Sequence, residues 1–402
     1  MKVAILGYGT VGSGVAEVLD KNSVSISKKA GEDITVASIL DLRDFPDSPH
    51  CSLFTKNYDD IINNPEIAVV IETMGGLVPA YEYVKAALSK GKSVVTSNKE
   101  LVAAHGAALL DAAAKNNVNF LFEASVGGGI PIIRPLHQCL AANEITGITG
   151  ILNGTTNYIL TKMVKENIDF ETILKTAQQL GYAERNPSAD VDGHDACRKI
   201  CILASLAFGS HVYPEYVYTE GITKITLDDM ECASAAGCVI KLLGRAKRLD
   251  DGKVFIMVSP CVISKEHPLA NVEDVFNAIL VSADATGDVM FYGKGAGKLP
   301  TASAVVADII DCAKHQSARK WLYWKDGDAS LIKDHTGMVT SFLVRLDAKI
   351  NLDSYDFISS QINDFNAFIT KEMTEKELTI KLAPLEKNII SKIRICKQDT
   401  EL

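Results

Sequence analysis

Residues 177–199 bring together the side chains that could do chemistry. Three carboxylates and one ammonium in AQQLGYAERNPSADVDGHDACRK could grip a polar zwitterion and move a proton: Glu184, Asp190, Asp195 and Lys199. Gly, Asn and Pro predict turns in the first part, and the run DACRKICILASLAFG predicts a mostly apolar helix. Asp195 and Lys199 would then lie four residues apart on one helical face. Such a lysine could act as a proton donor, although an ordinary surface ion pair has the same spacing.

The chain opens with a pattern that is typical of dinucleotide binding. MKVAILGYGTVGSGVAEVL predicts a buried strand, then the glycines of GxGxxG, then a helix. Gly7 permits a tight turn, Gly9 lets the backbone approach a pyrophosphate, and Gly12 allows close packing of the helix on the strand. The phosphates would then lie at the helix N-terminus, beside Thr10 and Val11.

A carboxylate for the ribose is expected at the end of the second strand. DITVASILD ends at Asp41, farther from Gly12 than is usual, and the polar stretch KNSVSISKKAGED can absorb the excess. Arg43 follows two residues later. An Asp favours NAD and a nearby Arg favours NADP, so the sequence leaves the cofactor preference open.

Composition and charge indicate a cytoplasmic enzyme of several domains. A chain of 402 residues should divide into two or three domains. The net charge of −9, without long runs of Lys or Arg, argues against a nucleic-acid or membrane partner. The nine cysteines lack zinc-ligand spacing, which favours small buried thiols in a reducing compartment. No cleavable signal is visible, and the longest apolar run is about half of a membrane span.

Alternating strands and helices in the first third predict a doubly wound parallel sheet. Ligands of such sheets bind beyond the carboxyl ends of the strands. The turns at those ends include Thr73 and Gly75 after AVVIET, and Lys99 after SVVTSN. Lys99 could face the crevice, or it could simply begin a helix at the surface.

Glycine-rich stretches also mark the later parts of the chain. SVGGGIPIIRPL, after Glu123, would expose carbonyls and amides to a ligand or a hard cation, or else form a tight inter-domain turn. GILNGTTNYIL offers amides and hydroxyls, at Gly154 and Thr155, between a strand and a helix. VFIMVSPCVIS, NAILVSAD and VMFYGKG predict the strands of a mixed second domain. GKGAGKLPTASAVVADIIDCAK could close over a flat cofactor ring or be purely structural.

Taken together, these motifs resemble the homoserine dehydrogenase family. Residues 177–199 fit the family signature at every fixed position, including Gly181, Asn186, Pro187, Asp190, Gly193, Asp195 and Lys199. The other landmarks follow in the family's order: GYGTVGSGV, ETMGG, TSNKELVA, FEASVGGGIPII, GILNGTTNYIL and YGKGAGKLPTASAVVADI. The similarity covers roughly residues 1–320.

The resemblance implies reversible, NAD(P)-dependent interconversion of L-homoserine and L-aspartate 4-semialdehyde, in the route from aspartate to threonine, isoleucine and methionine. Lys199 then matches the acid/base lysine, Asp195 the carboxylate beside it, and Lys99 a second active-site lysine. The positions matched to substrate binding are Glu184, Asp190, Gly154, Thr155 and Tyr182. Oxidation requires the lysine to lose its proton, and an unperturbed lysine has a pKa of about 10.4. Homoserine oxidation is therefore expected to be faster at alkaline pH.

The resemblance also implies a cofactor site and a cation site. The positions matched to NAD or NADP binding are Gly7, Gly9, Thr10, Val11, Gly12, Asp41, Arg43, Thr73, Gly75, Lys99, Gly295, Ala296 and Gly297. A monovalent cation, commonly sodium in the family, would be held by the carbonyls of Val126, Gly128 and Ile130, with Glu123 close by. The family usually pairs through its second domain, so a homodimer or homotetramer is expected.

Three domains are expected. Residues 1–125 would form a Rossmann-type NAD(P)-binding domain, joined by a returning helix near 301–318. Residues 126–300 would form an α+β substrate-binding and dimerisation domain with a mixed sheet, and 337–402 a small, divergent ACT-like α+β domain. The last region predicts strand, helix, two strands, helix and strand, but LDAKINLDS lacks the glycine usual where such domains contact amino acids. The missing glycine favours an assembly or vestigial role for this region over feedback inhibition by threonine.

Other readings of the sequence remain. No aspartate-kinase module precedes Met1, which predicts a monofunctional enzyme. A first alternative is another semialdehyde or amino-acid dehydrogenase on the same nucleotide fold, and an assay with homoserine and aspartate semialdehyde distinguishes it. A second is a non-catalytic, NAD(P)-sensing regulator, which the two lysines and three carboxylates disfavour.

Overall fold

The computed structural model describes residues 1–316, 318 and 322–397. The chain divides into two compact units. The first unit comprises Met1–Asn143, Cys201–Pro214 and Gly293–Asp328, and the second comprises Glu144–Ile200, Glu215–Tyr292 and Ala329–Leu402. These boundaries differ from the expected ones, because residues 126–143 belong to the first unit and the C-terminal region shares a unit with the mixed sheet.

The first unit is built on a six-stranded parallel sheet with the order β3-β2-β1-β4-β5-β6. Its strands are β1 (Lys2–Leu6), β2 (Thr35–Leu40), β3 (Phe54–Thr55), β4 (Ile67–Glu72), β5 (Ser93–Thr96) and β6 (Phe120–Leu121). The strand order reverses between β1 and β4, which is the switch point where doubly wound sheets bind ligands. The predicted Rossmann-type sheet is confirmed.

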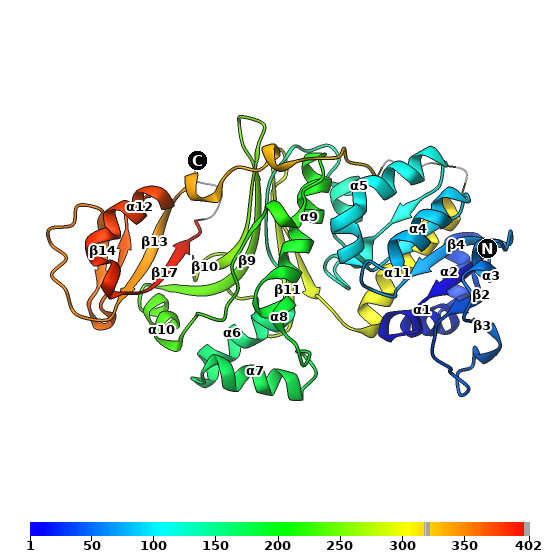
Figure 1. The fold of residues 1–402 in the computed structure, drawn as a ribbon, viewed down its shortest axis with the longest axis horizontal. Helices are drawn as coiled ribbons and strands as arrows, with labels where there is room; N and C mark the ends of the chain where they lie inside the picture. The colour runs from blue at the N-terminus through cyan, green and yellow to red at the C-terminus, as the bar shows by residue number, and fades with distance from the viewer. Residues whose placement is uncertain (317, 319–321, 398–402) are drawn as a thin grey trace. The chain divides into compact units, whose positions relative to one another are not determined.

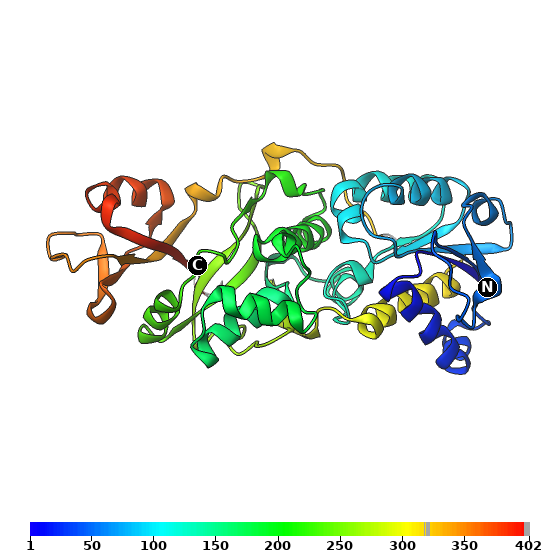
Figure 2. The ribbon, with the colours of Figure 1, turned by 60° about the horizontal axis from the view of Figure 1, so that its bottom comes forward.

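Helices cover both faces of this sheet, as Figures 1 and 2 show. Helices α4 (Ala80–Ser89) and α5 (Lys99–Lys115) lie on one face, and α1 (Thr10–Lys21), α2 (Ser23–Ala30) and α11 (Lys298–Lys314) lie on the other. A single helical turn, α3 (Asp59–Ile62), precedes β4. Because both faces are covered, strands such as β1 are buried along almost their whole length.

Helix α2 occupies most of the polar stretch that separates α1 from β2. Ile26 and Ala30 are buried, and they lie four residues apart on one face of the helix. The helix ends at Gly31, whose φ of +87° suits a glycine. The extra residues between Gly12 and Asp41 are thus partly accommodated by a helix.

The second unit contains an eleven-stranded mixed sheet, which confirms the mixed-sheet domain that was predicted. Its main path runs β12-β11-β7-β9-β10-β17-β13-β15-β14, and β8 pairs with β10 while β16 pairs with β13. The strands are β7 (Ile145–Ile151), β8 (Tyr218–Thr219), β9 (Cys238–Arg248), β10 (Val254–Ser264), β11 (Phe276–Ala283), β12 (Gly287–Lys294), β13 (Val339–Leu346), β14 (Ile358–Ile362), β15 (Ala367–Thr370), β16 (Met373–Thr374) and β17 (Ile389–Ile395). Strand β10 is parallel to β8 and β17 and antiparallel to β9.

Six helices accompany this sheet, some of which carry candidate site residues. They are α6 (Gly154–Glu166), α7 (Phe170–Gln179), α8 (Ser188–Val191), α9 (His194–Phe208), α10 (Leu227–Ala235) and α12 (Glu375–Leu382). Helix α9 begins in the second unit, and its residues from Cys201 onward belong to the first. Across the described residues, no helix combines the length and the apolar character that crossing a bilayer requires.

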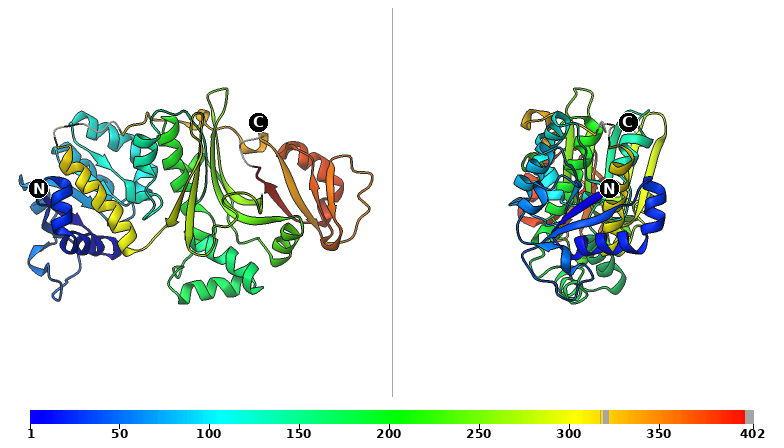
Figure 3. Two further views of the ribbon diagram at one scale, coloured as in Figure 1. Left: turned by 180° about the vertical axis from the view of Figure 1, so that it is seen from behind. Right: turned by 90° about the vertical axis from the view of Figure 1, so that its right-hand side faces the viewer.

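The C-terminal region departs from the predicted pattern in one element. Strands β13, β14, β15 and β17 and helix α12 follow the expected order (Figure 3), but residues 347–357 contain no helix. The prediction of a first helix there is wrong. This stretch is rich in Asn, Asp and Ser, which compete with helical hydrogen bonds: Asn351 accepts the backbone N–H of Asp353 at 2.9 Å. Leu352 and Phe357 are instead buried in the core of the region.

Candidate active site

Lys199 and Asp195 form a buried ion pair on the first turns of α9. Lys199 Nζ lies 2.7 Å from Asp195 Oδ2 and also donates to the carbonyl of Leu152 at 2.7 Å. The two residues are only 7% and 3% exposed. They are therefore not an ordinary surface ion pair, and the ammonium is held at a defined position in a protected environment.

Asn153 joins this pair to a second carboxylate, and sequence reasoning missed it. Its Nδ2 donates to Asp190 Oδ1 at 2.7 Å and to Asp195 Oδ2 at 2.8 Å. Its Oδ1 accepts the N–H of Thr156 at 2.8 Å and so caps α6. The available signal was an Asn directly before the helical GTTNYIL, which is a preferred N-cap residue. One amide side chain thus connects the start of α6 with both acids.

Of the other predicted substrate residues, Gly154 and Thr155 begin α6, and the carbonyl of Tyr182 contacts Thr155. Thr155 Oγ1 donates to the carbonyl of Tyr182 at 2.6 Å. A Cβ on Gly154 would lie 2.8 Å from the carbonyl of Val275, so this position requires glycine. Glu184 is exposed; its carbonyl accepts from Gln178, and its side chain makes no hydrogen bond to the described residues. The structure therefore brings Asp190, but not the Glu184 carboxylate, into the hydrogen-bond network of Lys199.

The glycine loop between β1 and α1 has the geometry of a phosphate cradle. A Cβ on Gly12 would lie 1.9 Å from the carbonyl oxygen of Gly7, whereas a Cβ on Gly9 would meet no atom within 4 Å. The backbone N–H groups of Thr10, Val11 and Gly12 donate to no described residue. Free amides at the positive end of a helix suit a pyrophosphate, so these residues fit the implied dinucleotide.

Glu72, at the end of β4, organises the adjacent turn and was not predicted as a site residue. Its carboxylate accepts the N–H groups of Met74 at 2.8 Å and Gly75 at 3.2 Å, and the hydroxyl of Thr96 at 2.5 Å. Complete burial raises the pKa of Glu72. Thr73 donates to the carbonyl of Gly7 at 2.8 Å, so this turn also supports the glycine loop. The signal was an acid at the end of an otherwise apolar strand.

Asp41 and Arg43 lie side by side beyond β2. Asp41 accepts the N–H of Tyr8 at 2.7 Å, and Arg43 reaches the same carboxylate through Nε at 3.0 Å and Nη2 at 2.9 Å. These hydrogen bonds, chiefly from Arg43, hold the pKa of Asp41 well below its usual range. Both residues line a cavity of about 340 Å³ together with Phe45 and Phe54, whose rings stack at 5.0 Å. Both therefore stay candidates for the ribose end of the cofactor.

Lys99 is the first residue of α5, directly beyond the carboxyl end of β5. The preceding Asn98 caps the helix by accepting the N–H of Leu101 at 3.1 Å, and its amide donates to the carbonyl of Gly76 at 2.7 Å. Asn98 therefore anchors the start of α5 to the turn that follows Thr73 and Gly75. Lys99 belongs to the first unit, whereas Lys199 belongs to the second.

The predicted cation loop touches the predicted nicotinamide loop. A Cβ on Gly128 would lie 2.5 Å from the carbonyl oxygen of Gly295, and the N–H of Gly129 donates to Lys294 at 3.2 Å. Gly297, which precedes α11, has a φ of +127° that only glycine adopts readily. The two glycine-rich stretches, far apart in sequence, pack directly against each other within the first unit.

Backbone carbonyls in this loop suit a monovalent cation. Among the described residues, no hydrogen bond ends on the carbonyls of Val126, Gly128 or Ile130, and all three residues are buried. Buried carbonyls without a donor are costly unless another partner satisfies them. No group of three His, Cys, Asp or Glu side chains in the described structure could hold a metal. The residues present therefore fit a cation held by the main chain.

The Glu123 carboxylate forms hydrogen bonds with three backbone N–H groups. Its carboxylate accepts the N–H groups of Ile132 at 2.6 Å, Ile133 at 2.9 Å and Arg134 at 2.8 Å. Asp308 accepts the N–H of Glu123 and pairs with the Arg134 guanidinium. Burial and the neighbouring Glu123 raise the pKa of Asp308 to about 7. These contacts fix the Glu123 carboxylate against the start of the segment that follows the cation loop.

A parallel nucleotide-binding sheet and a buried ammonium–carboxylate pair are the parts of a dinucleotide-dependent oxidoreductase. Two family models match this chain: homoserine dehydrogenase, NAD binding domain, over residues 7–123, and homoserine dehydrogenase over residues 131–310. The homoserine dehydrogenase of Synechocystis sp. is 48% identical over 318 residues, which are 77% of this chain and 73% of that protein. The chain belongs to the homoserine dehydrogenase family, and it is an NAD(P)-dependent oxidoreductase.

Solved structures extend the likeness beyond the family models. A homoserine dehydrogenase from Thiobacillus denitrificans matches with a TM-score of 0.90 at 35% identity, covering 99% of this chain and 98% of that chain. A hyperthermophilic archaeal homoserine dehydrogenase in complex with NADPH matches with a TM-score of 0.66 at 29% identity, covering 77% and 96%. The family models end at residue 310, so the first of these matches also includes the C-terminal strands.

Proposed function

We propose that this chain catalyses the reversible reduction of L-aspartate 4-semialdehyde to L-homoserine with NAD(P)H, in the route from aspartate to threonine, isoleucine and methionine. The observation that carries this proposal is the buried Lys199–Asp195 pair, which Asn153 connects to Asp190. An aldehyde reduction needs a cation that stabilises and protonates the oxygen as charge develops on it. The buried Lys199 ammonium, held by Asp195, fits that role.

The roles of the remaining residues are those that the family resemblance implies, and the contacts of Asp195 and Asp190 support two of them. When bound, the nicotinamide would supply or accept the hydride. Lys199 protonates the substrate oxygen during reduction and removes its proton during oxidation, while Asp195 holds the ammonium in place. Asp190, together with Glu184, binds the substrate's own ammonium group. Lys99, beyond β5, serves as the second lysine at the nicotinamide end of the site.

The cofactor is NAD or NADP. The open face of Gly9 and the free amides of α1 support binding of the pyrophosphate that both cofactors share. Asp41 favours NAD, and Arg43 favours NADP once its guanidinium turns from Asp41 to a 2′-phosphate. Initial rates with each nucleotide measure the preference directly.

A monovalent cation is proposed for the glycine-rich loop after Glu123. Sodium bound by the carbonyls of Val126, Gly128 and Ile130 would stabilise the loop that contacts Gly295. The enzyme acts as a homodimer or homotetramer in the cytoplasm, where its nine cysteines stay reduced. The C-terminal region is a diverged ACT-like module with an assembly role; its β…ββαβ order supports this origin.

Replacing Lys199 tests the proposed mechanism. Lys199→Ala is expected to reduce kcat in both directions by about 100-fold or more, because the acid/base group is lost. NAD(P)H binding, measured by nucleotide fluorescence, should be unchanged, since the phosphate cradle belongs to the other unit. Wild-type homoserine oxidation should also be faster at alkaline pH than at neutral pH.

A matched control variant and three possible contrary results define what this experiment can exclude. Lys162→Ala removes another i,i+4 ion pair of the second unit, with Glu166, and should keep wild-type rates. If Lys199→Ala retained most of the wild-type kcat, Lys199 would not be the acid/base group. A wild-type protein that binds NAD(P)H but turns over neither substrate would be a regulator, and one that reduces only another semialdehyde would be a different dehydrogenase.

A further inference from the structure

Asp190 lies in residues 188–193, which comprise the short helix α8 and the turn that follows it; we call this segment the Asp190 turn. It packs against residues 218–222. The N–H of Ile222 donates to the carbonyl of Val191 at 2.8 Å. A Cβ on Gly221 would lie 2.0 Å from that same carbonyl oxygen, and one on Gly193 would lie 3.1 Å from the Thr219 side chain. The two backbones are therefore in direct contact, and a shift of residues 218–222 must shift the turn.

A cation from the C-terminal strand β17 holds residues 218–222. Arg394 Nη1 donates to Glu220 Oε2 at 2.8 Å, and its guanidinium lies 5.1 Å from the centre of the Tyr218 ring. Tyr218 completes the contact by donating to the same Glu220 oxygen at 3.2 Å. Arg394 is only 6% exposed, whereas the Glu220 side chain is 34% exposed, so solvent screens this ion pair only in part.

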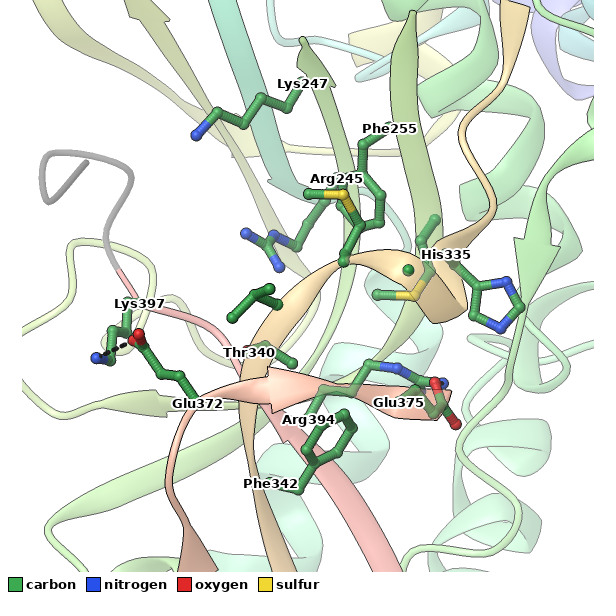
Figure 4. A pocket seen from close by; sticks show the side chains of 14 residues that line it. Arg245, Lys247, Phe255, His335, Thr340, Phe342, Glu372, Glu375, Arg394 and Lys397 are labelled. Carbon is green, nitrogen blue, oxygen red and sulfur yellow. Dashed lines mark hydrogen bonds and ion pairs between the residues drawn. The ribbon is translucent and has the colours of Figure 1, made fainter. Parts of the chain in front are cut away.

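The other side of the Arg394 guanidinium is anchored within the C-terminal region. Its Nη2 donates at 2.6 Å to Glu375, the first residue of α12. Figure 4 shows both side chains on the wall of a cavity of about 370 Å³ that the second-unit sheet and the C-terminal region share. Burial alone would lower the pKa of Arg394, but Glu375 and Glu220 outweigh it and raise the pKa. The guanidinium stays charged and bridges two carboxylates from different parts of the second unit.

We propose that Arg394 and Glu220 are positioning residues for the substrate site. They hold residues 218–222, and through them the Asp190 turn, so that Asp190 meets Asn153 and the start of α9 presents Asp195. This inference rests on the proposed function, in which Asp190 binds the amino-acid substrate. It gives the C-terminal region a role in catalysis that is independent of any effector.

Lys392, two residues before Arg394 on β17, provides a matched control. It lies on the same strand and donates to the other oxygen of Glu375 at 2.8 Å. It is not among the partners of Glu220 or Tyr218. Lys392→Met therefore removes a charge from the same cluster without touching the segment that supports the turn.

Steady-state kinetics with both substrates of the reaction test the proposal. Arg394→Met and Glu220→Gln are each expected to raise the KM for homoserine about tenfold, because small displacements of binding groups weaken substrate binding steeply. The KM for NAD(P) should stay within about twofold of wild type, since the nucleotide loop lies in the other unit. Arg394→Lys should restore part of the loss, and Lys392→Met should match wild type.

A second measurement keeps the test independent of turnover. Hydrogen–deuterium exchange of peptides covering residues 183–197 is expected to be faster in Arg394→Met than in wild type and unchanged in Lys392→Met. Folded Arg394→Met and Glu220→Gln proteins with a wild-type homoserine KM and wild-type exchange would overturn the proposal. An equal rise of the KM values for homoserine and for NAD(P) would also overturn the proposal. A similar rise of the homoserine KM in Lys392→Met would do the same. A wild type that does not oxidise homoserine would refute the proposed function instead, and the exchange experiment would still test the support of the turn.

Discussion

At the scale of single residues, burial distinguishes the Lys199–Asp195 ion pair from a common surface pair. Lys115 and Asp111 have the same i,i+4 spacing as Lys199 and Asp195, and their charged atoms are similarly close, at 2.6 Å and 2.7 Å. The lysine side chain is 73% exposed in the first pair and 9% exposed in the second. An exposed pair contributes little stability, whereas loss of one partner from a buried pair strands a charge and costs about 3–5 kcal/mol.

Asn153 offers the sharpest prediction at this scale. Asn153→Ser keeps a residue able to cap α6 but removes the amide that donates to Asp190 and Asp195. We expect kcat/KM for homoserine to fall about 10- to 100-fold, with a loss of stability below about 1 kcal/mol. Asn153→Asp should be worse, because a third carboxylate would face the other two. Kinetics together with thermal unfolding measure both effects.

Asp169→Ser is the matched control for the cap. Asp169 caps α7 by accepting the N–H of Thr172 at 3.0 Å, and its only side-chain partner in the described structure is Thr172. This variant should show a comparable small change in stability and wild-type kinetics. If Asn153→Ser behaved in the same way, Asn153 would be a helix cap and nothing more.

At the scale of elements, the strand–loop–helix unit β1–α1 assigns different tasks to glycines only a few residues apart. Gly12 makes room for the backbone of Gly7, and without that space the helix could not pack on the strand. Gly9 has open space on its exposed side and a φ of −80°, which any residue can adopt. Gly12 therefore contributes to the stability of the fold, whereas the space beside Gly9 is open to the proposed ligand.

Two alanine substitutions distinguish these tasks. Gly12→Ala is expected to lower the free energy of unfolding by ~1–3 kcal/mol through overpacking. Gly9→Ala should leave stability unchanged and weaken NAD(P)H binding at least about tenfold, which corresponds to about 1.4 kcal/mol. Chemical denaturation and nucleotide fluorescence titrations report the two quantities. Tight NAD(P)H binding by Gly9→Ala would contradict a pyrophosphate at this loop.

At the scale of the whole molecule, the C-terminal region is built into the second unit. Strand β17 pairs with β10, so the sheet is continuous. Buried Arg345 on β13 donates to Asp229 at 2.9 Å and to Asp228 at 3.1 Å, both on α10. Ser391 on β17 donates to the same Asp229 oxygen at 2.5 Å. Burial raises the pKa of Asp229, but these hydrogen bonds outweigh it and lower the pKa.

Breaking this network should destabilise the second unit as a whole. Arg345→Met leaves a buried, unpaired carboxylate and is expected to cost about 3–5 kcal/mol of unfolding free energy. Adding Asp229→Asn should recover part of the loss. Because the pKa of Asp229 is lower in the folded state, its stabilising contribution is present at neutral pH and is lost as the pH falls through the folded value. Urea denaturation of wild type and variants should therefore differ least in acid.

Limited proteolysis supplies the complementary result. Arg345→Met should become sensitive to cleavage between residues 339 and 397, whereas wild type should resist. Rapid release of this region from the wild-type protein, with the rest still folded, would show that the C-terminal strands form an independent module.

Much of the architecture was predictable because its causes are local. The apolar runs of β1, β4 and β5 and the helices between them indicated a parallel sheet, and Gly7, Gly9 and Gly12 indicated its phosphate loop. Local causes also misled, because the pattern of the C-terminal region predicted a helix after its first strand. In the structure Asn351 forms a turn there, and Leu352 packs into a core that distant strands help to form.

The sequence by itself determined which groups are available: the Lys199–Asp195 spacing, the nucleotide loop and the family signature. Only the tertiary structure decided that this pair is buried, that Asn153 links it to Asp190, and that Arg394 braces the turn. The physical reason is separation along the chain. Asn153 and Asp195 are 42 residues apart and Arg394 and Glu220 are 174 apart. Such partners meet only when distant segments pack, and neither spacing nor residue type specifies that packing.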